Sequence, residues 1–301
     1  MSVFQEIRTA FDRRDNALNQ LLLLNVLVFA ALIILHAGLT IGGVGGLYEP
    51  VLRQFAMSSS LPVLARHPWT VLTYAFTHEG FFHILFNLLN LYWFGQIIRE
   101  YLGNRRLVSL YVLGALAGGL VFLLSYNFLP AFRPGLGASV VGASASVTAI
   151  IVAAATLLPD FTFMLIFLGP VKIKWIALAV VLISLAGING GNPGGEITHL
   201  GGALLGFVFV KQLKAGRDLG RPIQAIGGWI GNLFSRRPSM SVSTTRRPEP
   251  VTTAARGARP AAAPGQPHPD EVDSILEKIS RSGYESLSKD EKQKLFRASQ
   301  Q

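Results

Sequence analysis

Two short segments of the chain hold the residue types that acyl transfer needs. Residues 142–146 read Gly-Ala-Ser-Ala-Ser, and residues 198–202 read Thr-His-Leu-Gly-Gly. A serine hydroxyl is a weak nucleophile that needs a base, and a histidine can take its proton and later return it to a leaving amine. Ser144 is therefore the candidate nucleophile, and His199 is the candidate general base and acid. Ser146 lies about 200° farther around a helix, so only one of the two serines can meet the base.

A third segment supplies hydrogen-bond donors for the negative charge that forms in such a reaction. His83 and Asn87 are four residues apart, so on a helix they share one face. Both side chains can donate to an oxyanion, together with free backbone N–H groups where a helix starts near Ser144. Glu196 only borders the last apolar run, so a Ser–His dyad without an orienting carboxylate is predicted.

The three segments begin long apolar runs that predict membrane-spanning helices. Half of the residues are hydrophobic and only 15% are charged, whereas soluble proteins average about 25% charged residues. A helix needs roughly 20 apolar residues to cross about 30 Å of hydrocarbon. The predicted fold class is an all-α polytopic membrane protein with six transmembrane helices, of which the last two are short. The spans lie at about residues 21–39, 80–98, 107–128, 140–158, 173–187 and 197–210.

Positive residues beside the spans predict their orientation, because Lys and Arg gather on the cytoplasmic side. They place both termini in the cytoplasm. The second, fourth and sixth spans then run inward from the external side, with His83, Ser144 and His199 near their starts. These three residues are expected at one depth, toward the external side of the membrane. The cytoplasmic set is Arg8, Arg13, Arg14, Arg99, Arg105, Arg106, Lys172, Lys174, Lys211, Lys214, Arg217 and Arg221, and the external set is Arg53, Arg66 and Arg133.

Each polar residue also has a structural explanation when it is taken alone. A serine within a span usually bonds its own helix backbone or helps helices pack, and a histidine at a span end is usually interfacial. Asn87 could make an interhelical hydrogen bond, and Gly202 with Gly206 forms a small-residue packing pair. Their convergence at one depth favours a functional site, because polar residues inside a membrane are costly.

The charge and the cysteine count exclude several classes of function. The net charge of +10 raises the question of nucleic-acid binding, but the Lys and Arg residues form no stripe and no nucleic-acid motif. Membrane topology accounts for them, so no nucleic-acid partner is predicted. The chain has no cysteine, which excludes disulfides and thiolate metal sites. No metal and no cofactor are predicted.

Composition divides the chain into five parts. Residues 1–20 are a cytoplasmic N-terminus, and residues 21–214 form the six-span domain, whose first external loop is expected to lie in the membrane interface. Residues 215–237 combine helical apolar spacing with basic flanks, which predicts an amphipathic juxtamembrane segment on the lipid bilayer. Residues 238–268 have the composition of a flexible linker. Residues 269–301 predict a small cytoplasmic helical hairpin that docks on an unknown partner or self-associates, because it is too small to be stable alone.

Three motifs together resemble the rhomboid family of intramembrane serine proteases. Residues 78–87 resemble the family's His-x4-His-x3-Asn signature, residues 142–144 its nucleophile motif, and residues 199–206 its His-x2-Gly-x3-Gly motif. The resemblance runs from about residue 68 to residue 206. It implies a six-helix bundle with a water-filled cavity that opens outward, and it implies the roles given above for Ser144, His199, His83 and Asn87. It also implies supporting positions at His78, Gly142 and Gly202.

The resemblance further implies an activity: an intramembrane serine endopeptidase, without cofactor, that cleaves single-pass or other membrane proteins in or near a transmembrane segment. A bacterial inner membrane is the expected location. Three positions depart from the family pattern. Ala145 stands where glycine is usual, Thr148 where an aromatic residue is often found, and Trp69-Thr70 in place of Trp-Arg. None removes a reacting group, so they bear on rate and loop packing.

Two other functions compete with the protease. One is a catalytically inactive rhomboid-like membrane chaperone or trafficking factor, against which the retention of Ser144 and His199 argues. The other is a small transporter, which predicts paired carboxylates or broken helices near the middle of the membrane. The sequence shows neither feature, so the protease is favoured.

Overall fold

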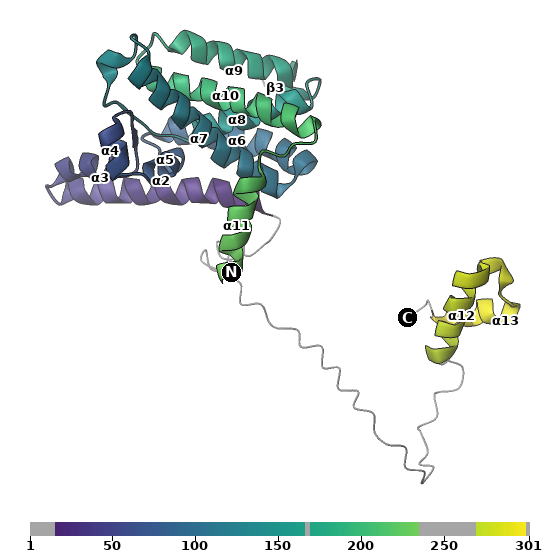
Figure 1. The fold of residues 1–301 in the computed structure, drawn as a ribbon. Coiled ribbons are helices and arrows are strands. Elements are labelled where there is room, and N and C mark those ends of the chain that lie inside the picture. The colour runs from purple at the N-terminus through teal and green to yellow at the C-terminus, as the bar shows by residue number, and fades with distance from the viewer. Residues whose placement is uncertain (1–15, 166–168, 235–268, 299–301) are drawn as a thin grey trace. The chain divides into compact units, whose positions relative to one another are not determined.

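The computed structural model describes residues 16–165, 169–234 and 269–298, and the chain divides into two units, residues 1–237 and 238–301. The first unit is mostly helical (Figure 1). Its helices are α2 (Ala17–Ile41), η1 (Gly45–Leu47), α3 (Tyr48–Leu52), α4 (Leu61–Arg66), α5 (Thr70–Thr73), η2 (Tyr74–Phe76), α6 (Phe81–Leu102), α7 (Asn104–Phe128), η3 (Arg133–Gly135), α8 (Ser144–Leu157), α9 (Ile173–Gly187), α10 (Pro193–Lys214) and α11 (Arg221–Phe234).

A helix lies at each of the six segments that the sequence marks as spans. Within the described residues, α2, α6 and α7 are long and apolar enough to cross a membrane, whereas α8 and α9 are apolar but shorter. The helical membrane fold is therefore confirmed, and the count of six spans stays a prediction.

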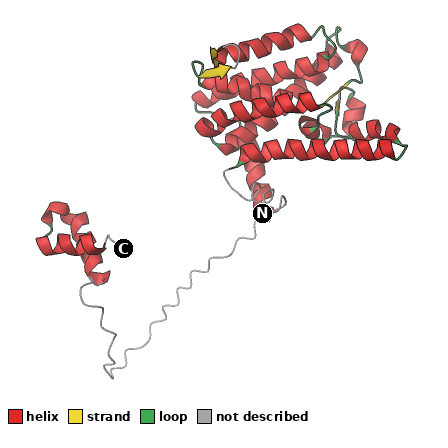
Figure 2. Ribbon diagram, turned by 180° about the vertical axis from the view of Figure 1, so that it is seen from behind, coloured by secondary structure: helices red, strands yellow, loops and turns green. Residues whose placement is uncertain are grey.

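The mostly helical fold agrees with the predicted class, and the chain also forms two small antiparallel sheets that the sequence did not predict (Figure 2). In one, β1 (Met57–Ser58) pairs with β2 (Ser139–Val140); in the other, β3 (Thr162–Leu165) pairs with β4 (Gly169–Lys172). Asp160, just before β3, accepts hydrogen bonds from Lys174 and Lys172, which lower the pKa of its carboxyl to about 2. Strands of two to four residues carry too little periodicity to be recognised in a sequence.

Helix α8 lies at the centre of the bundle, between α7 and α10 (Figure 1). From residue 145 to residue 155 every residue of α8 except Val152 is buried. Glycines of the neighbouring helices make this approach possible. A methyl group at Gly202 or Gly206 of α10 would collide with a backbone carbonyl oxygen of α8, and one at Gly118 of α7 would lie 2.6 Å from the Ala145 side chain. The three helices therefore touch almost backbone to backbone.

Helix α10 begins four residues earlier than the sequence suggests, at Pro193. The side chain of Asn192 accepts a hydrogen bond from the backbone N–H of Gly195 at 3.0 Å, and a proline follows at the first helical position. Asparagine is a favoured N-cap, and proline suits the first position because its missing N–H would have no partner there. As a result Glu196 belongs to the first turn of the helix, and it does not merely border it.

The first external loop, expected at about residues 40–69, contains short helices and the strand β1. The segment that follows it is fastened to α7 by two buried tyrosines. The hydroxyl of Tyr74 donates to the carbonyl of Ala115 at 2.6 Å, and the hydroxyl of Tyr111 donates to the carbonyl of Ala75 at 2.7 Å. The carbonyl of Tyr74 in turn accepts the N–H of Gly142 at 2.9 Å. This chain of bonds fixes the backbone that leads into α8.

The second unit contains α12 (Pro269–Ser282), η4 (Tyr284–Ser286) and α13 (Lys289–Ala298). A capping box opens α13: the N–H of Ser288 donates to the Glu291 carboxylate at 2.7 Å, and the N–H of Glu291 donates to the Ser288 hydroxyl at 3.3 Å. In the first unit, α11 occupies the expected juxtamembrane segment. The linker at 238–268, together with Arg8, Arg13 and Arg14 near the N-terminus, lies outside the described residues.

The contact between α8 and α10 yields a stability prediction. Gly206→Ala places a methyl group against the Ala149 carbonyl of α8, so the helices must separate. We expect the free energy of unfolding to fall by about 1–3 kcal/mol, as overpacking usually costs, seen as a lower thermal midpoint in detergent. Gly38→Ala is the matched control, because this α2 glycine has no atom within 4 Å of the added methyl. Equal midpoints for the two variants would contradict the close packing.

Candidate active site

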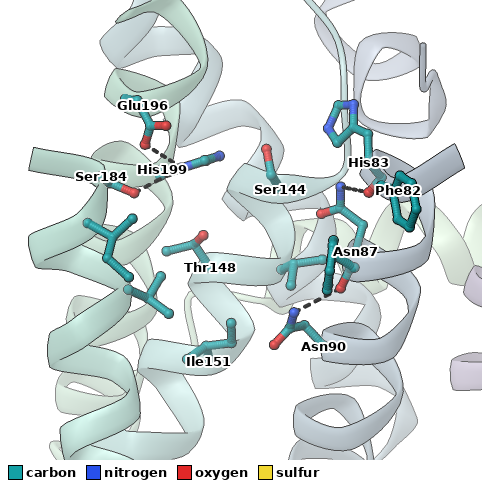
Figure 3. Close-up of a pocket in the computed structure, with 14 residues that line it drawn as sticks. Phe82, His83, Asn87, Asn90, Ser144, Thr148, Ile151, Ser184, Glu196 and His199 are labelled. Atoms are coloured by element: carbon teal, nitrogen blue, oxygen red, sulfur yellow. Dashed lines mark hydrogen bonds and ion pairs between the residues drawn. The ribbon is translucent and has the colours of Figure 1, made fainter. Parts of the chain in front are cut away.

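A cavity of about 750 Å³ opens among α6, α8, α9 and α10. All four residues that the sequence singles out for chemistry line it: Ser144, His199, His83 and Asn87. Figure 3 shows His199 on one side of Ser144 and His83 on the other, with the His199 ring directed toward the serine. Much of the remaining wall is apolar, and it consists of Phe82, Phe86, Val147, Ile151, Val180 and Ile183.

Ser144 is the first residue of α8, so backbone N–H groups beside it have no partner within the helix. The residue two before it must be glycine. Gly142 has a φ of +125°, and a methyl group there would lie 2.6 Å from Nε2 of His83 and 3.6 Å from Oγ of Ser144. Residues other than glycine rarely adopt such a φ. Because Gly142 has no side chain, the backbone can pass close to the ring of His83, and the side chains of His83 and Ser144 can lie near each other.

His78 contacts the same turn, at the residue before Ser144. Its Nε2 accepts a hydrogen bond from the backbone N–H of Ala143 at 3.3 Å, and its ring lies edge-on to His83 with centroids 5.0 Å apart. Burial, and next the neighbouring His83, lower the pKa of His78 to about 4. A neutral ring at neutral pH is what an accepting nitrogen needs. The hydrogen bond from Ala143 gives a physical basis for the supporting role predicted for His78.

His83 and Asn87 lie one helical turn apart on α6, as their spacing predicts. The side-chain amide of Asn87 donates to the carbonyl of His83 at 2.9 Å, within its own helix. Asn90, one turn farther along, also lines the cavity and donates to the carbonyl of Phe86 at 2.8 Å. Asn90 was not singled out from the sequence, although the same four- and three-residue spacing extends to it.

His199 has contacts at one ring nitrogen that the sequence analysis did not foresee. Its Nδ1 lies 3.2 Å from Oε2 of Glu196 and 2.9 Å from Oγ of Ser184 on α9. The histidine therefore does have a carboxylate neighbour, because Glu196 stands three residues before it on the same helix. With Nδ1 engaged, Nε2 is the nitrogen left to face Ser144. No hydrogen bond joins Ser144 to His199 among the described residues; such contacts are often long without substrate.

Ser146, the other serine of the motif, is fully buried, and its hydroxyl donates to the carbonyl of Tyr111 at 2.7 Å. It ties α8 to α7 and does not reach the cavity. The two serines thus have opposite environments: one is on the cavity wall, and the other is a packing contact.

A family model and several known proteins match part of this chain. Residues 65–214 match the rhomboid domain family. The chain belongs to the rhomboid family. It is 32% identical over 158 residues to RHOMBOID-like protein 12, mitochondrial, of Arabidopsis thaliana, covering 49% of this chain and 47% of that protein. It is also 32% identical over 164 residues to Rhomboid protein 1, mitochondrial, of Saccharomyces cerevisiae, covering 52% and 45%.

A further match is Rhomboid-like protein 16, chloroplastic, of Arabidopsis thaliana, at 28% identity over 160 residues, covering 49% of this chain and 50% of that protein. The chain spans about half the length of the curated relatives that it matches. Residues 267–301, which contain the helical hairpin, match a family of unknown function (DUF6576).

The three departures from the rhomboid pattern have local explanations. The side chain of Ala145 lies against Gly118 of α7, where a glycine would leave empty space. Thr148 lines the cavity and presents a hydroxyl in place of an aromatic ring. The hydroxyl of Thr70 donates to the carbonyl of His67 at 2.7 Å, and Nε1 of Trp69 donates to the carbonyl of Gln54 at 2.7 Å. None of the three displaces Ser144 or His199 from the cavity wall.

Proposed function

We propose that this chain is an intramembrane serine endopeptidase that cleaves membrane-anchored proteins in or near their transmembrane segments. The observation that carries the proposal is the placement of Ser144 and His199 on facing walls of one cavity within the helical bundle. In a helical membrane protein, polar groups gathered in a cavity indicate function, because they are costly elsewhere in the bilayer.

The reaction follows from the roles of the cavity residues. The hydroxyl of Ser144 attacks the scissile carbonyl carbon while Nε2 of His199 takes the hydroxyl proton. The carbonyl oxygen becomes an oxyanion, which backbone N–H groups at the start of α8 and the side chains of His83 and Asn87 stabilise. Collapse of the intermediate breaks the C–N bond, and the proton on His199 goes to the leaving amine. Water then attacks the acyl-serine by the same steps and regenerates Ser144.

A catalytically inactive rhomboid-like chaperone is the alternative. A chaperone of this kind would need the same fold, but it would not need the reacting groups to be in place. Ser144, His199 and the donors of α6 all line the cavity, which favours the protease.

The orientation is part of the proposal. Positive residues beside the spans place both termini in the cytoplasm and the cavity toward the external side. The bacterial inner membrane expected from the sequence stays a prediction, since the matched relatives are named for mitochondria and chloroplasts.

A reporter enzyme fused after Gln301 tests the orientation in cells. Cytoplasmic activity is expected; activity on the opposite side would overturn the argument that the three polar segments share one depth.

Cleavage of a membrane-anchored model substrate tests the activity. In detergent or proteoliposomes, the wild-type chain should cut a single-pass substrate, and Ser144→Ala or His199→Ala should abolish cutting. His83→Ala and Asn87→Ala should each slow turnover by about 10²–10³-fold at most, as loss of one oxyanion donor does.

Deletion of residues 238–301 is the control, because they belong to a separate unit, and none of its described residues, 269–298, lines the cavity. This shortened chain should keep most of its activity. A full-length chain that binds but never cuts such substrates would support the inactive alternative.

A further inference from the structure

The side chain of Glu196 is seated in a gap between α9 and the ring of His199. Its carboxylate oxygen Oε2 lies 3.2 Å from Nδ1 of His199, one turn away on α10. On the other side it packs against Gly187, the last residue of α9. A methyl group at Gly187 would lie 2.8–2.9 Å from Cγ, Cδ and Oε1 of Glu196. The absence of a side chain at Gly187 is thus what leaves room for this carboxylate.

Ser184, one turn earlier on α9, completes the surroundings of the same nitrogen. It is buried, and its Oγ lies 2.9 Å from Nδ1 of His199. A neutral imidazole carries a proton on one nitrogen and a lone pair on the other. A hydroxyl can donate or accept, so Ser184 alone is compatible with either form of the ring. An ionised carboxylate can only accept, so Glu196 requires the proton to be on Nδ1.

We propose that Glu196 is a positioning residue for His199, which keeps the proton on Nδ1 and the Nε2 lone pair aimed at Ser144. The inference rests on the proposed function and adds a third group to the predicted dyad. Once His199 has taken the serine proton, its ring is positive, and a carboxylate 3.2 Å from Nδ1 stabilises that charge. A buried acid beside the base has this role in the serine proteases that use three residues.

The charges around His199 make the role of Glu196 separable from simple packing. Among the described residues that line the cavity, Glu196 is the one acidic side chain. From α6, His83 is the other titratable group that faces the histidine, and α8 and α9 contribute the hydroxyls of Ser144, Thr148 and Ser184. Removing the carboxylate therefore removes the one negative charge that favours protonated His199. The histidine then stays neutral, and able to act as base, to a lower pH.

The pH dependence of cleavage by the full-length chain tests this inference. With a single-pass model substrate between about pH 5 and pH 8, where histidine titrates, Glu196→Gln should lower kcat with little change in KM. A loss of about 10²–10⁴-fold is expected, the range for groups that support general acid–base catalysis. Its acid limb should also move to lower pH. Ser184→Ala is the matched control: it removes the other partner of Nδ1, keeps the charge, and should leave the acid limb in place.

The assay is informative when the wild-type chain cleaves the substrate and Ser144→Ala does not. Under that condition, two results would overturn the inference. One is a Glu196→Gln variant with the wild-type rate and acid limb. The other is a lower rate explained by a lower thermal midpoint alone, with the acid limb unmoved, which would assign Glu196 to packing.

A second readout does not depend on cleavage. Nitrogen NMR of ring-labelled histidine in the full-length Ser144→Ala protein reports which nitrogen carries the proton, and His199→Gln identifies the His199 signals by difference. We expect Nδ1–H for His199 with Glu196 present, and a shift toward Nε2–H in the Glu196→Gln background. An Nε2–H ring with Glu196 intact would sink the inference even if no substrate is ever cut. Conversely, an Nδ1–H ring in a chain that never cleaves would support the positioning role of Glu196 and contradict only the proposed protease activity.

Discussion

The close approach of α8 to its neighbours is the constraint on which the rest of the structure depends. Gly202 and Gly206 of α10 leave no space for a methyl group against the carbonyl oxygens of α8. On α7, a methyl group at Gly114 would lie 2.8 Å from the Ala149 side chain of α8, and one at Gly118 would lie 2.6 Å from the Ala145 side chain. In lipid, helices associate through this kind of packing, because no hydrophobic force drives them together. Ser144 sits at the start of α8 and His199 one turn before Gly202. The packing contact therefore also sets the separation of Ser144 and His199, the two proposed reacting groups.

The turn before α8 is the second requirement, and it is made by hydrogen bonds to residues far away in sequence. Gly142 bonds to Tyr74, which bonds to α7, while β1 pairs with β2 immediately before the turn. The segment that contains β1 thus braces the backbone beside Ser144, the proposed nucleophile. The proposed reaction would thus take place at a loop–helix junction, where free N–H groups and a positive φ are available together.

Much of the site could be predicted because its signals are local. The spacing of His83 and Asn87 places them on one helix face, and the positive residues give the second, fourth and sixth spans a common direction. The structure brings these residues to one cavity. Helical geometry predicts that only one of Ser144 and Ser146 can face the base, and the motif selects Ser144. The bond from Ser146 to the Tyr111 carbonyl agrees with that choice.

The parts that were missed depend on contacts between elements or on a helix boundary. Ser184 is a lone serine in an apolar run, and nothing in its sequence neighbourhood indicates that it faces a histidine. The seat for Glu196 needs Gly187 from another helix. One signal was readable: Asn192 followed by Pro193 is a helix start, and reading it would have put Glu196 one turn before His199.

Labelling with a serine-reactive phosphonate tests the central claim, an activated hydroxyl at Ser144, most directly. The probe reacts with a hydroxyl that a base has activated, and peptide mass spectrometry then reads the modified residue. The label should be on Ser144 in the wild type and in Ser146→Ala, and it should be absent from Ser144→Ala and His199→Ala. A label that survives Ser144→Ala and disappears in Ser146→Ala would contradict the account, as would a wild-type chain that takes no label at all.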